Sequence, residues 1–305
     1  MGMQEAKTSN AMKLTLGPVL FNWPTPMWAD FYARIADEAP VDRVVLGEVV
    51  CSKRTPFRQD AVGDVIERLE RSGKEVVLAA LALPTLKREI ADIEGLAGAG
   101  YLVEINDVTA LDAVSGSPHC VGPLVNVYNE ETLAELESLG ATTISLPPEL
   151  PLASIAILAA ARRKADLEVF AFGRAPLAIS ARCYHARAHG LPKDACKYVC
   201  EHDLDGIDVG TLDGQSFLAV NGVQTMASGV TVLGPEIREL EAAGVARLRL
   251  SPHTCDMVAV AQAFRDLVDG RLAASEMMAR ITAMNLPAAI VNGYLHGKAG
   301  AAFVG

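Results

Sequence analysis

Short apolar runs alternate with longer amphipathic stretches along most of this 305-residue chain. The runs have the length and β-branched content of buried strands, whereas the stretches repeat apolar residues at helical spacing. Strands are predicted at residues 14–20, 42–50, 75–81, 101–106, 119–128, 141–147, 167–173 and 246–252. Helices are predicted between most of them, most clearly near 26–38 and over 57–73, 130–140 and 152–164.

Eight such strand–helix units over about 255 residues predict an α/β fold of the (β/α)8 TIM-like barrel type. The competing arrangement is an open, doubly wound sheet. Its glycine-rich phosphate-binding turn is missing after the first strand, where GPVLFNWP stands instead. The most apolar run, VVLAALALP at 76–84, ends at Pro84 and is too short to cross a membrane, so we expect a buried strand there.

The regular alternation stops after Gly173 and resumes near Pro235. We therefore expect an insertion over about 174–235, between the seventh and eighth strands. Asp-Gly and Asn-Gly pairs between short apolar runs in 203–230 predict β-hairpin structure within it. In a barrel, an insertion at this point lies at the C-terminal mouth, where active sites are built.

Composition limits the class of protein and its partners. Hydrophobic residues are 50% and charged residues 21% of the chain, as in soluble globular proteins. The formal net charge of −10 argues against general nucleic-acid binding, which needs Lys and Arg to neutralise phosphates. Residues 1–11 lack the basic start and apolar core of a secretory signal. We expect a disordered tail there, a single domain over 12–305 and a cytoplasmic location.

Three of the six cysteines lie close together, in ARCYHARAHGLPKDACKYVC at 181–200. The residues between them are polar, basic and turn-forming, so core packing does not explain the cluster. In a reducing compartment, clustered cysteines indicate metal or redox chemistry. A tetrahedral ion or a cubane cluster needs about four ligands, so Cys183, Cys196 and Cys200 require a fourth. Cys51 is the favoured choice, because it follows the second strand and points toward the same mouth.

The remaining cysteines and nearby histidines leave alternatives open. Cys120, at the start of the fifth strand, is expected to be a small core residue. Cys255 follows the eighth strand and could also face the mouth. His185, His189 and His202 are close enough in sequence to replace a thiolate. The spacing therefore indicates a metal site without deciding between zinc and iron–sulfur.

Other polar residues near the predicted mouth are weaker candidates for chemistry. They are Glu48, Arg54, Arg182, Arg249 and His253, followed by Asn126, Asn129 and Glu149. A guanidinium pairs well with a carboxylate-bearing ligand, and a histidine can move protons at neutral pH. Glu48 could orient the Cys51 loop or act as a buried acid. Each residue also has an ordinary structural explanation, such as a salt bridge, a surface histidine or a helix cap.

Several segments of the chain resemble the peptidase U32 family. They are LTLGPVLFNWP (14–24), VVLGEVVCSKR (44–54), FGRAPLAISARCYHAR (172–187), PKDACKYVC (192–200), FLAVNGVQTMASG (217–229) and VARLRLSPHTCD (245–256). The pattern of one early cysteine and three late ones resembles that of the family branch that serves oxygen-independent hydroxylation in ubiquinone biosynthesis. The resemblance implies that Cys51, Cys183, Cys196 and Cys200 ligate a 4Fe–4S cluster.

The resemblance also implies partners and a reaction. It implies a heterodimer with a UbiU-like sister subunit, itself an iron–sulfur protein. A UbiT-like sterol-carrier lipid-binding protein is expected to present hydrophobic quinone precursors. Relatives that hydroxylate RNA suggest prephenate as the oxygen donor, by analogy. Within such a system this chain could share catalysis or serve as an electron-transfer or accessory subunit.

Two other functions stay open at this stage. One is an RNA-modifying hydroxylase, as in other branches of the family. The other is a peptidase, although no Ser-His-Asp context, HExxH motif or nucleophile elbow occurs in the sequence.

Overall fold

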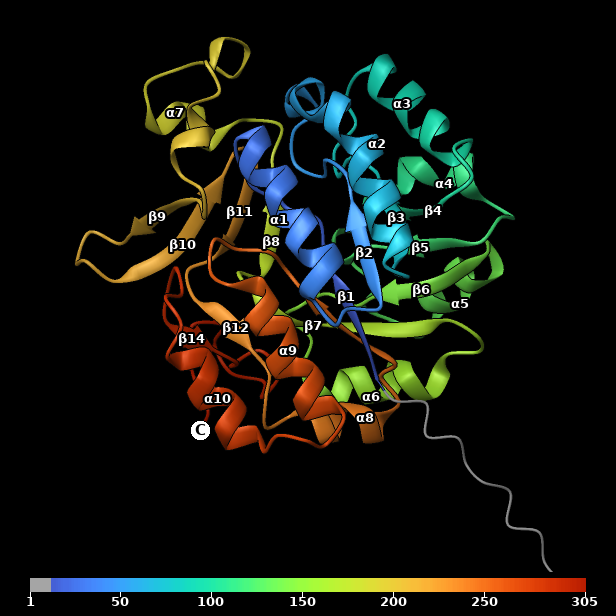
Figure 1. Ribbon diagram of the computed structural model, residues 1–305, viewed down its shortest axis with the longest axis vertical. Helices are drawn as coiled ribbons and strands as arrows, with labels where there is room; N and C mark the ends of the chain where they lie inside the picture. The colour runs from blue at the N-terminus through green and yellow to red at the C-terminus, as the bar shows by residue number, and fades with distance from the viewer. Residues whose placement is uncertain (1–11) are drawn as a thin grey trace, which may run out of the picture.

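The computed structural model describes residues 12–305, and a closed barrel of eight parallel strands forms its centre (Figure 1). The barrel closes because the last strand pairs in parallel with both the first and the seventh. Its strands are β1 (Lys13–Leu16), β2 (Arg43–Leu46), β3 (Glu75–Ala79), β4 (Leu102–Ile105), β5 (His119–Val121), β6 (Ala141–Ser145), β7 (Asp166–Gly173) and β13 (Arg247–Leu250). The predicted (β/α)8 fold is confirmed. The predicted tail at 1–11 lies outside the described residues.

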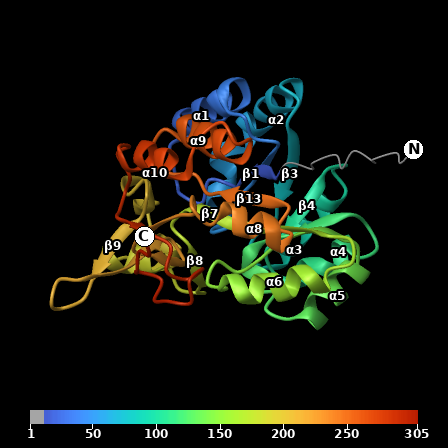
Figure 2. The same cartoon turned by 90° about the horizontal axis from the view of Figure 1, so that it is seen from below.

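Helices surround the barrel, as the view from below in Figure 2 shows. They are α1 (Thr25–Glu38), α2 (Thr55–Arg71), α3 (Lys87–Ala97), α4 (Leu111–Val114), α5 (Glu130–Ser138), α6 (Leu152–Ala161), α8 (Ile237–Ala243), α9 (Met257–Val268) and α10 (Ala274–Thr282). The helices expected near 26–38 and over 57–73, 130–140 and 152–164 correspond to α1, α2, α5 and α6, within a few residues at each end. Among residues 12–305, no helix combines the length and the hydropathy needed to cross a bilayer.

Alternation along the strands divides the apolar core into two parts. In β2, Val44 and Leu46 belong to the core between barrel and helices, whereas Val45 belongs to a second core inside the barrel. Because successive side chains of a strand point to opposite faces, one short strand supplies both layers. The strands are therefore buried on both faces, which explains their nearly continuous apolar sequences.

In β13, with the sequence RLRL, the same alternation places a charged side chain inside the barrel. Leu248 and Leu250 pack in the core beneath the helices, and the side chain of Arg249 is buried inside the barrel. There its two terminal nitrogens bind Glu104 of β4 at 2.7 and 2.9 Å, and one of them also binds Glu168 of β7 at 3.0 Å. Such a cluster is tolerated only when each charge is paired, because an unpaired buried charge is very costly.

The expected insertion occupies the chain between β7 and α8 and forms a small antiparallel sheet (Figure 1, yellow and gold). Its strands, in spatial order, are β8 (Pro176–Ile179), β11 (Gln224–Ala227), β10 (Ser216–Asn221) and β9 (Ile207–Gly210). The helix α7 (Tyr184–Ala188) lies in the long connection between β8 and β9. The strand β12 (Val230–Val232) then returns to the main sheet, pairing with β7 and with β14 (Ile290–Val291). The predicted hairpins are confirmed.

The turn between β10 and β11 has a strict backbone requirement. Asn221 pairs with Gln224, so Gly222 and Val223 form a two-residue turn. Gly222 has a φ of 61°, which favours glycine at the first position of such a turn. A Cβ at Gly222 would also lie 2.9 Å from the Arg54 guanidinium. The Asn-Gly pair therefore allows the hairpin tip to approach the loop after β2 closely.

Glu137, in the last turn of α5, fixes the entry to β7. It is buried and accepts hydrogen bonds of 2.7–3.1 Å from the backbone N–H groups of residues 163–165. Burial acts to raise the pKa of Glu137, but these donors outweigh it and hold the pKa below its ordinary value. Its stabilisation is therefore complete above an ordinary glutamate pKa of about 4.3 and is lost as the pH falls through the folded-state pKa.

We predict that Glu137→Gln lowers the free energy of unfolding at pH 7 by about 1–3 kcal/mol, because an amide nitrogen would face backbone donors. Denaturant unfolding at pH 7 and below pH 4 measures this, and the difference from wild type should shrink at the lower pH. Glu135→Gln, on the exposed face of the same helix, is the control and should change little. Equal stability of the two variants at pH 7 would contradict the assignment.

Candidate functional site: a four-thiol pocket at the barrel mouth

Cys51, Cys183, Cys196 and Cys200 line one pocket at the barrel mouth. Cys51 lies in the segment that follows β2, and the other three cysteines belong to the connection between β8 and β9. Cys200 is buried and the other three are half-buried. The structure thus brings one early cysteine and three late ones to the same place.

Glu48 holds the Cys51 loop in position. One of its carboxylate oxygens accepts hydrogen bonds of 2.9 Å from the backbone N–H groups of both Val50 and Cys51. The same carboxylate lies 3.7 Å from Arg54 and 3.4 Å from Arg58, and all three side chains are buried. Of the two roles predicted for Glu48, the geometry matches loop orientation, because its oxygens are already engaged.

Arg54 joins this loop to the insertion. Its guanidinium donates to the backbone oxygen of Leu20 at 2.7 Å and to Oδ1 of Asn221 at 3.0 Å. The residue is only 1% exposed and lines the four-thiol pocket. Its remaining nitrogen, Nε, is buried with no hydrogen-bond partner among the described residues. The early and late parts of the pocket are therefore connected through one buried side chain.

Local backbone geometry places the late cysteines. Cys183 is the N-cap of α7, and its Sγ accepts from the backbone N–H of Ala186 at 3.4 Å. Lys197 and Tyr198 have φ values of 51° and 55°, which reverse the chain between Cys196 and Cys200. Residues other than glycine rarely adopt this left-handed backbone conformation. Contacts with the surrounding structure must therefore stabilise the turn.

The other two cysteines lie away from the pocket. Burial raises the pKa of Cys120 to about 11 and that of Cys255 to about 12. Cys120 lies inside the barrel with its Sγ 3.6 Å from Arg43, and the Sγ of Cys255 lies 3.8 Å from the sulfur of Met257. Neither lines the four-thiol pocket. Both therefore remain protonated side chains of the core at neutral pH.

Four cysteines lining one pocket match the number of ligands of a tetrahedral zinc ion and of a cubane iron–sulfur cluster. Tetrahedral zinc with Zn–S bonds of about 2.3 Å needs its sulfurs about 3.8 Å apart. Within residues 12–305, these sulfurs form no set of three or more whose members all lie within 4.8 Å of one another. A cubane binds each thiolate on a different iron, so its sulfurs stand farther apart. The buried Arg54 Nε and His185 Nδ1 lack partners in the described part of the chain, and both residues line the pocket.

A histidine pair lies beside the pocket. His185 Nε2 is 2.9 Å and His189 Nε2 is 3.8 Å from Oδ2 of Asp203, and the two rings are nearly parallel. Burial lowers the pKa of His185. This group connects α7 to the segment that carries Cys200. His202, also considered as a substitute ligand, does not line the pocket.

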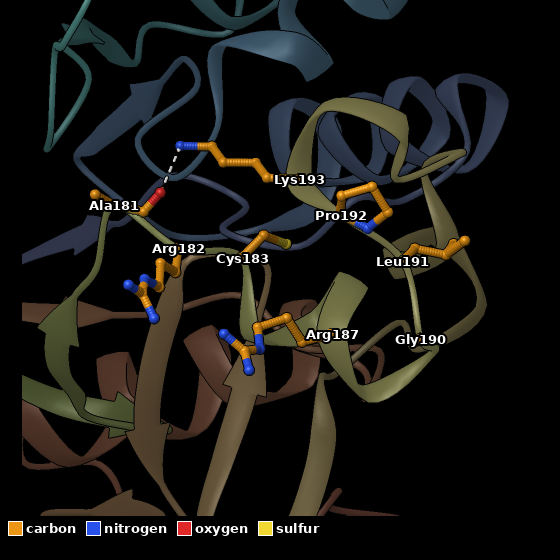
Figure 3. Close-up of a pocket in the computed structure, with 8 residues that line it drawn as sticks. All are labelled: Ala181, Arg182, Cys183, Arg187, Gly190, Leu191, Pro192 and Lys193. Carbon is orange, nitrogen blue, oxygen red and sulfur yellow. Dashed lines mark hydrogen bonds between the residues drawn. The ribbon is translucent and has the colours of Figure 1, made fainter.

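Arg182 lies in an open groove on the outer side of Cys183 (Figure 3). Arg187 and Lys193 also line this groove, so three basic side chains gather next to one pocket cysteine. In Figure 3, Lys193 reaches across the groove and donates to the backbone oxygen of Ala181 at 3.0 Å. The groove is a positive surface on a chain of net charge −10.

His253 and Arg249 have their polar atoms engaged by the protein. His253 Nε2 accepts from the backbone N–H of Arg174 and its Nδ1 lies 3.0 Å from Asp205, so the ring has no nitrogen free for proton transfer. Arg249 binds two carboxylates and is not available to a third.

The weaker candidates have structural roles. Asn129 caps α5 through the N–H of Thr132, Asn126 occupies a left-handed turn with a φ of 63°, and Glu149 accepts from the hydroxyl of Tyr128.

Sequence reasoning missed three buried amides at the mouth: Asn106, Asn221 and Gln224. Asn221 and Gln224 flank the turn of the Asn-Gly hairpin, and Asn106 follows β4. The sequence feature that could have identified them is the position of each polar residue, at the C-terminal end of a barrel strand or in the insertion.

A family model described as "Peptidase family U32" matches residues 30–303. Among solved structures, thiamine phosphate pyrophosphorylase from Pyrococcus furiosus aligns over 90% of this chain and 96% of its own, with 11% identity and a TM-score of 0.38. The tryptophan synthase complex from Pyrococcus furiosus aligns over 88% and 98%, with 11% identity and a TM-score of 0.40. Likenesses this distant support no inference about function.

Asp205 attaches the insertion to the barrel, which yields a stability prediction. Its carboxylate accepts from the backbone N–H and the hydroxyl of Thr254 and faces His253 Nδ1. We expect Asp205→Ala to lower stability by about 1–3 kcal/mol, since it leaves a buried imidazole nitrogen unpaired. Thermal unfolding and limited proteolysis within 203–230 measure the effect. Asp213→Ala, at the exposed hairpin tip, is the control. Unchanged melting and cleavage in Asp205→Ala would refute this attachment.

Proposed function

This chain belongs to the peptidase U32 family, and we propose that it is a UbiV-type iron–sulfur subunit of an oxygen-independent hydroxylation system in ubiquinone biosynthesis. The observation that carries the proposal is the meeting of Cys51 with Cys183, Cys196 and Cys200 in one pocket. Thiolates are the ligands that iron–sulfur clusters use, and four cysteine side chains line this pocket. The four cysteines would hold a 4Fe–4S cluster.

A bound cluster would supply single-electron transfer, and four cysteine ligands would leave none of its irons open to substrate. The protein residues then have defined tasks. Glu48 fixes the Cys51 backbone, Arg54 ties that loop to the insertion, and Cys183 is fixed at the start of α7. Rigid ligands support fast electron transfer, because little has to rearrange when the charge changes.

The proposal includes partners. The chain would act as a heterodimer with a UbiU-like sister subunit, and a UbiT-like lipid-binding protein would deliver hydrophobic quinone precursors. Prephenate is the proposed oxygen donor. The groove formed by Arg182, Arg187 and Lys193 gives an acidic surface or ligand a place to bind next to Cys183.

We predict that Cys51→Ser, Cys183→Ser, Cys196→Ser and Cys200→Ser each lower iron and sulfide content after anaerobic purification. A decrease of at least about tenfold is expected, because even outer-shell partners of metal ligands have effects of that size. Colorimetric iron and sulfide assays and the visible absorption spectrum measure it. Cys255→Ser and Cys120→Ser are matched controls outside the pocket and should retain the cluster. Full iron content in any of the four pocket variants would exclude that cysteine as a ligand.

A growth experiment tests the biological role. Deleting the gene should abolish ubiquinone formation during anaerobic growth while leaving aerobic ubiquinone unchanged. A plasmid carrying wild type or Cys255→Ser should restore it, and one carrying Cys51→Ala should not. Normal anaerobic ubiquinone in the deletion strain would refute the proposal. A missing hydroxylated nucleoside in its RNA, with normal ubiquinone, would favour the RNA-modifying alternative.

A further inference from the structure

Two histidines and one aspartate form a compact group beside the four-thiol pocket, separate from the four proposed cluster ligands. His185 belongs to α7, His189 is the C-cap of this helix, and Asp203 follows Cys200 by three residues. One nitrogen of each ring and one oxygen of the carboxylate all lie within 4.8 Å of one another. Among residues 12–305, no other His, Cys, Asp or Glu side chains make a group of three this compact.

The helical spacing brings the two imidazoles to the same side of α7. His185 and His189 are four residues apart, so their side chains are neighbours on one helix face. Their rings are nearly parallel, with an interplanar angle of 13° and centroids 5.7 Å apart. Two histidines at this spacing hold zinc in metalloproteases, because a nitrogen of each ring can reach the same point.

The distances from the two rings to the carboxylate fit a single ion. His185 Nε2 lies 2.9 Å and His189 Nε2 lies 3.8 Å from the same atom, Asp203 Oδ2. Zinc bonds of about 2.0–2.2 Å at tetrahedral angles place two such ligand atoms about 3.4 Å apart. One observed distance is slightly shorter than this and the other slightly longer, so small side-chain rotations would equalise them.

A hydrogen bond explains the position of His185 but not that of His189. The Nε2 of His189 is too far from Asp203 for a hydrogen bond, yet it faces the same oxygen. In the described part of the chain, no Lys or Arg lies within 4.0 Å of the Asp203 carboxylate, which pairs with the two histidines alone. Imidazole and carboxylate together suit zinc and its neighbours, whereas Mg²⁺ and Ca²⁺ prefer oxygen ligands.

Proton positions and access are both compatible with an ion. Because a carboxylate only accepts, its contact with His185 requires the ring proton on Nε2. An ion would replace this proton, and the neutral ring would carry its proton on Nδ1 instead. The side chains of His189 and Asp203 are 38% and 31% exposed, so an ion can enter from solvent and water can complete its coordination.

We propose that His185 Nε2, His189 Nε2 and Asp203 Oδ2 bind one zinc ion. The ion would join α7, whose N-cap is Cys183, to the segment that follows Cys200. It would thereby hold together two segments that carry pocket cysteines. The site does not depend on the proposed cluster, because it uses none of the four thiols.

Zinc titration of the full-length protein, purified under argon, tests the site by calorimetry and thermal unfolding. Zinc at about a hundredfold excess over its Kd should raise the melting temperature by about 4 °C. His189→Gln should weaken zinc binding at least about tenfold. Without zinc, this variant should melt like wild type, because the bond between His185 and Asp203 remains.

Matched variants separate this site from zinc bound by thiols. All of them retain the four pocket cysteines, so a difference between variants does not come from those sulfurs. His202→Gln, an exposed histidine next to Asp203, is the control and should bind zinc like wild type. Asp203→Asn keeps an acceptor for His185 but loses the charge, and should weaken binding as His189→Gln does.

Cobalt identifies the ligand atoms by their absorption. Co²⁺ bound by nitrogen and oxygen gives weak visible bands, and bound thiolates add an intense near-ultraviolet band. His189→Gln should lose visible absorption that wild type and His202→Gln show, and it should keep any thiolate band at wild-type strength.

The outcomes separate this inference from the proposed function. Equal zinc affinity and equal cobalt spectra in wild type and folded His189→Gln would overturn the site and leave the bond between His185 and Asp203 as a structural contact only. Iron measured in the same samples tests the cluster independently. Iron-free protein that binds zinc through His189 would retain this site and remove the cluster, and iron-loaded protein without such zinc binding would do the reverse.

Discussion

The pairing of the buried Arg249 guanidinium with Glu104 and Glu168 is the interaction on which the rest of this structure depends. It links β13, the strand that closes the barrel, to β4 across the interior and to β7 beside it. Burial acts to lower the pKa of Arg249, but the two carboxylates outweigh it and hold the pKa above its ordinary value. Replacing Arg249 alone would leave two buried anions, which costs far more than the intact cluster contributes. The same pairing leaves Arg249 unavailable to a third carboxylate.

The tip of the β10–β11 hairpin lies at the barrel mouth, between the four-thiol pocket and the barrel interior. Its turn is narrow because Gly222 tolerates a positive φ, so Asn221 and Gln224 reach the barrel mouth. Asn221 contacts Arg54 on one side and Gln224 on the other. Arg54 lines the four-thiol pocket, and Gln224 lines a small cavity beside Arg249. One hairpin tip therefore connects the loop that carries Cys51 to the barrel mouth through buried polar side chains.

The insertion is fixed to the barrel from the opposite side as well. Asp205 accepts from Thr254 and faces His253, and the Trp23 indole donates to the backbone oxygen of Leu204 at 2.7 Å. Phe21 packs against the His253 ring with centroids 5.1 Å apart. These contacts follow Cys200 by only a few residues, so they restrict where the late cysteines can lie. The four thiols are thus positioned by protein contacts, which lowers the entropy that a metal site would otherwise have to overcome.

The sequence alone predicted the barrel and pointed to the late cysteines, because both depend on local patterns. Apolar runs of strand length mark all eight barrel strands, the Asn-Gly pair marks the hairpin, and the crowding of Cys183, Cys196 and Cys200 marks a metal site whose ligand role stays a prediction. Only the tertiary structure decided which charges meet. Arg249 reaches Glu104 across 145 residues, and RLRL by itself looks like a half-exposed strand. His253 and Gln224 were equally undetermined, since whether a polar atom is free depends on partners that only folding brings within hydrogen-bond distance.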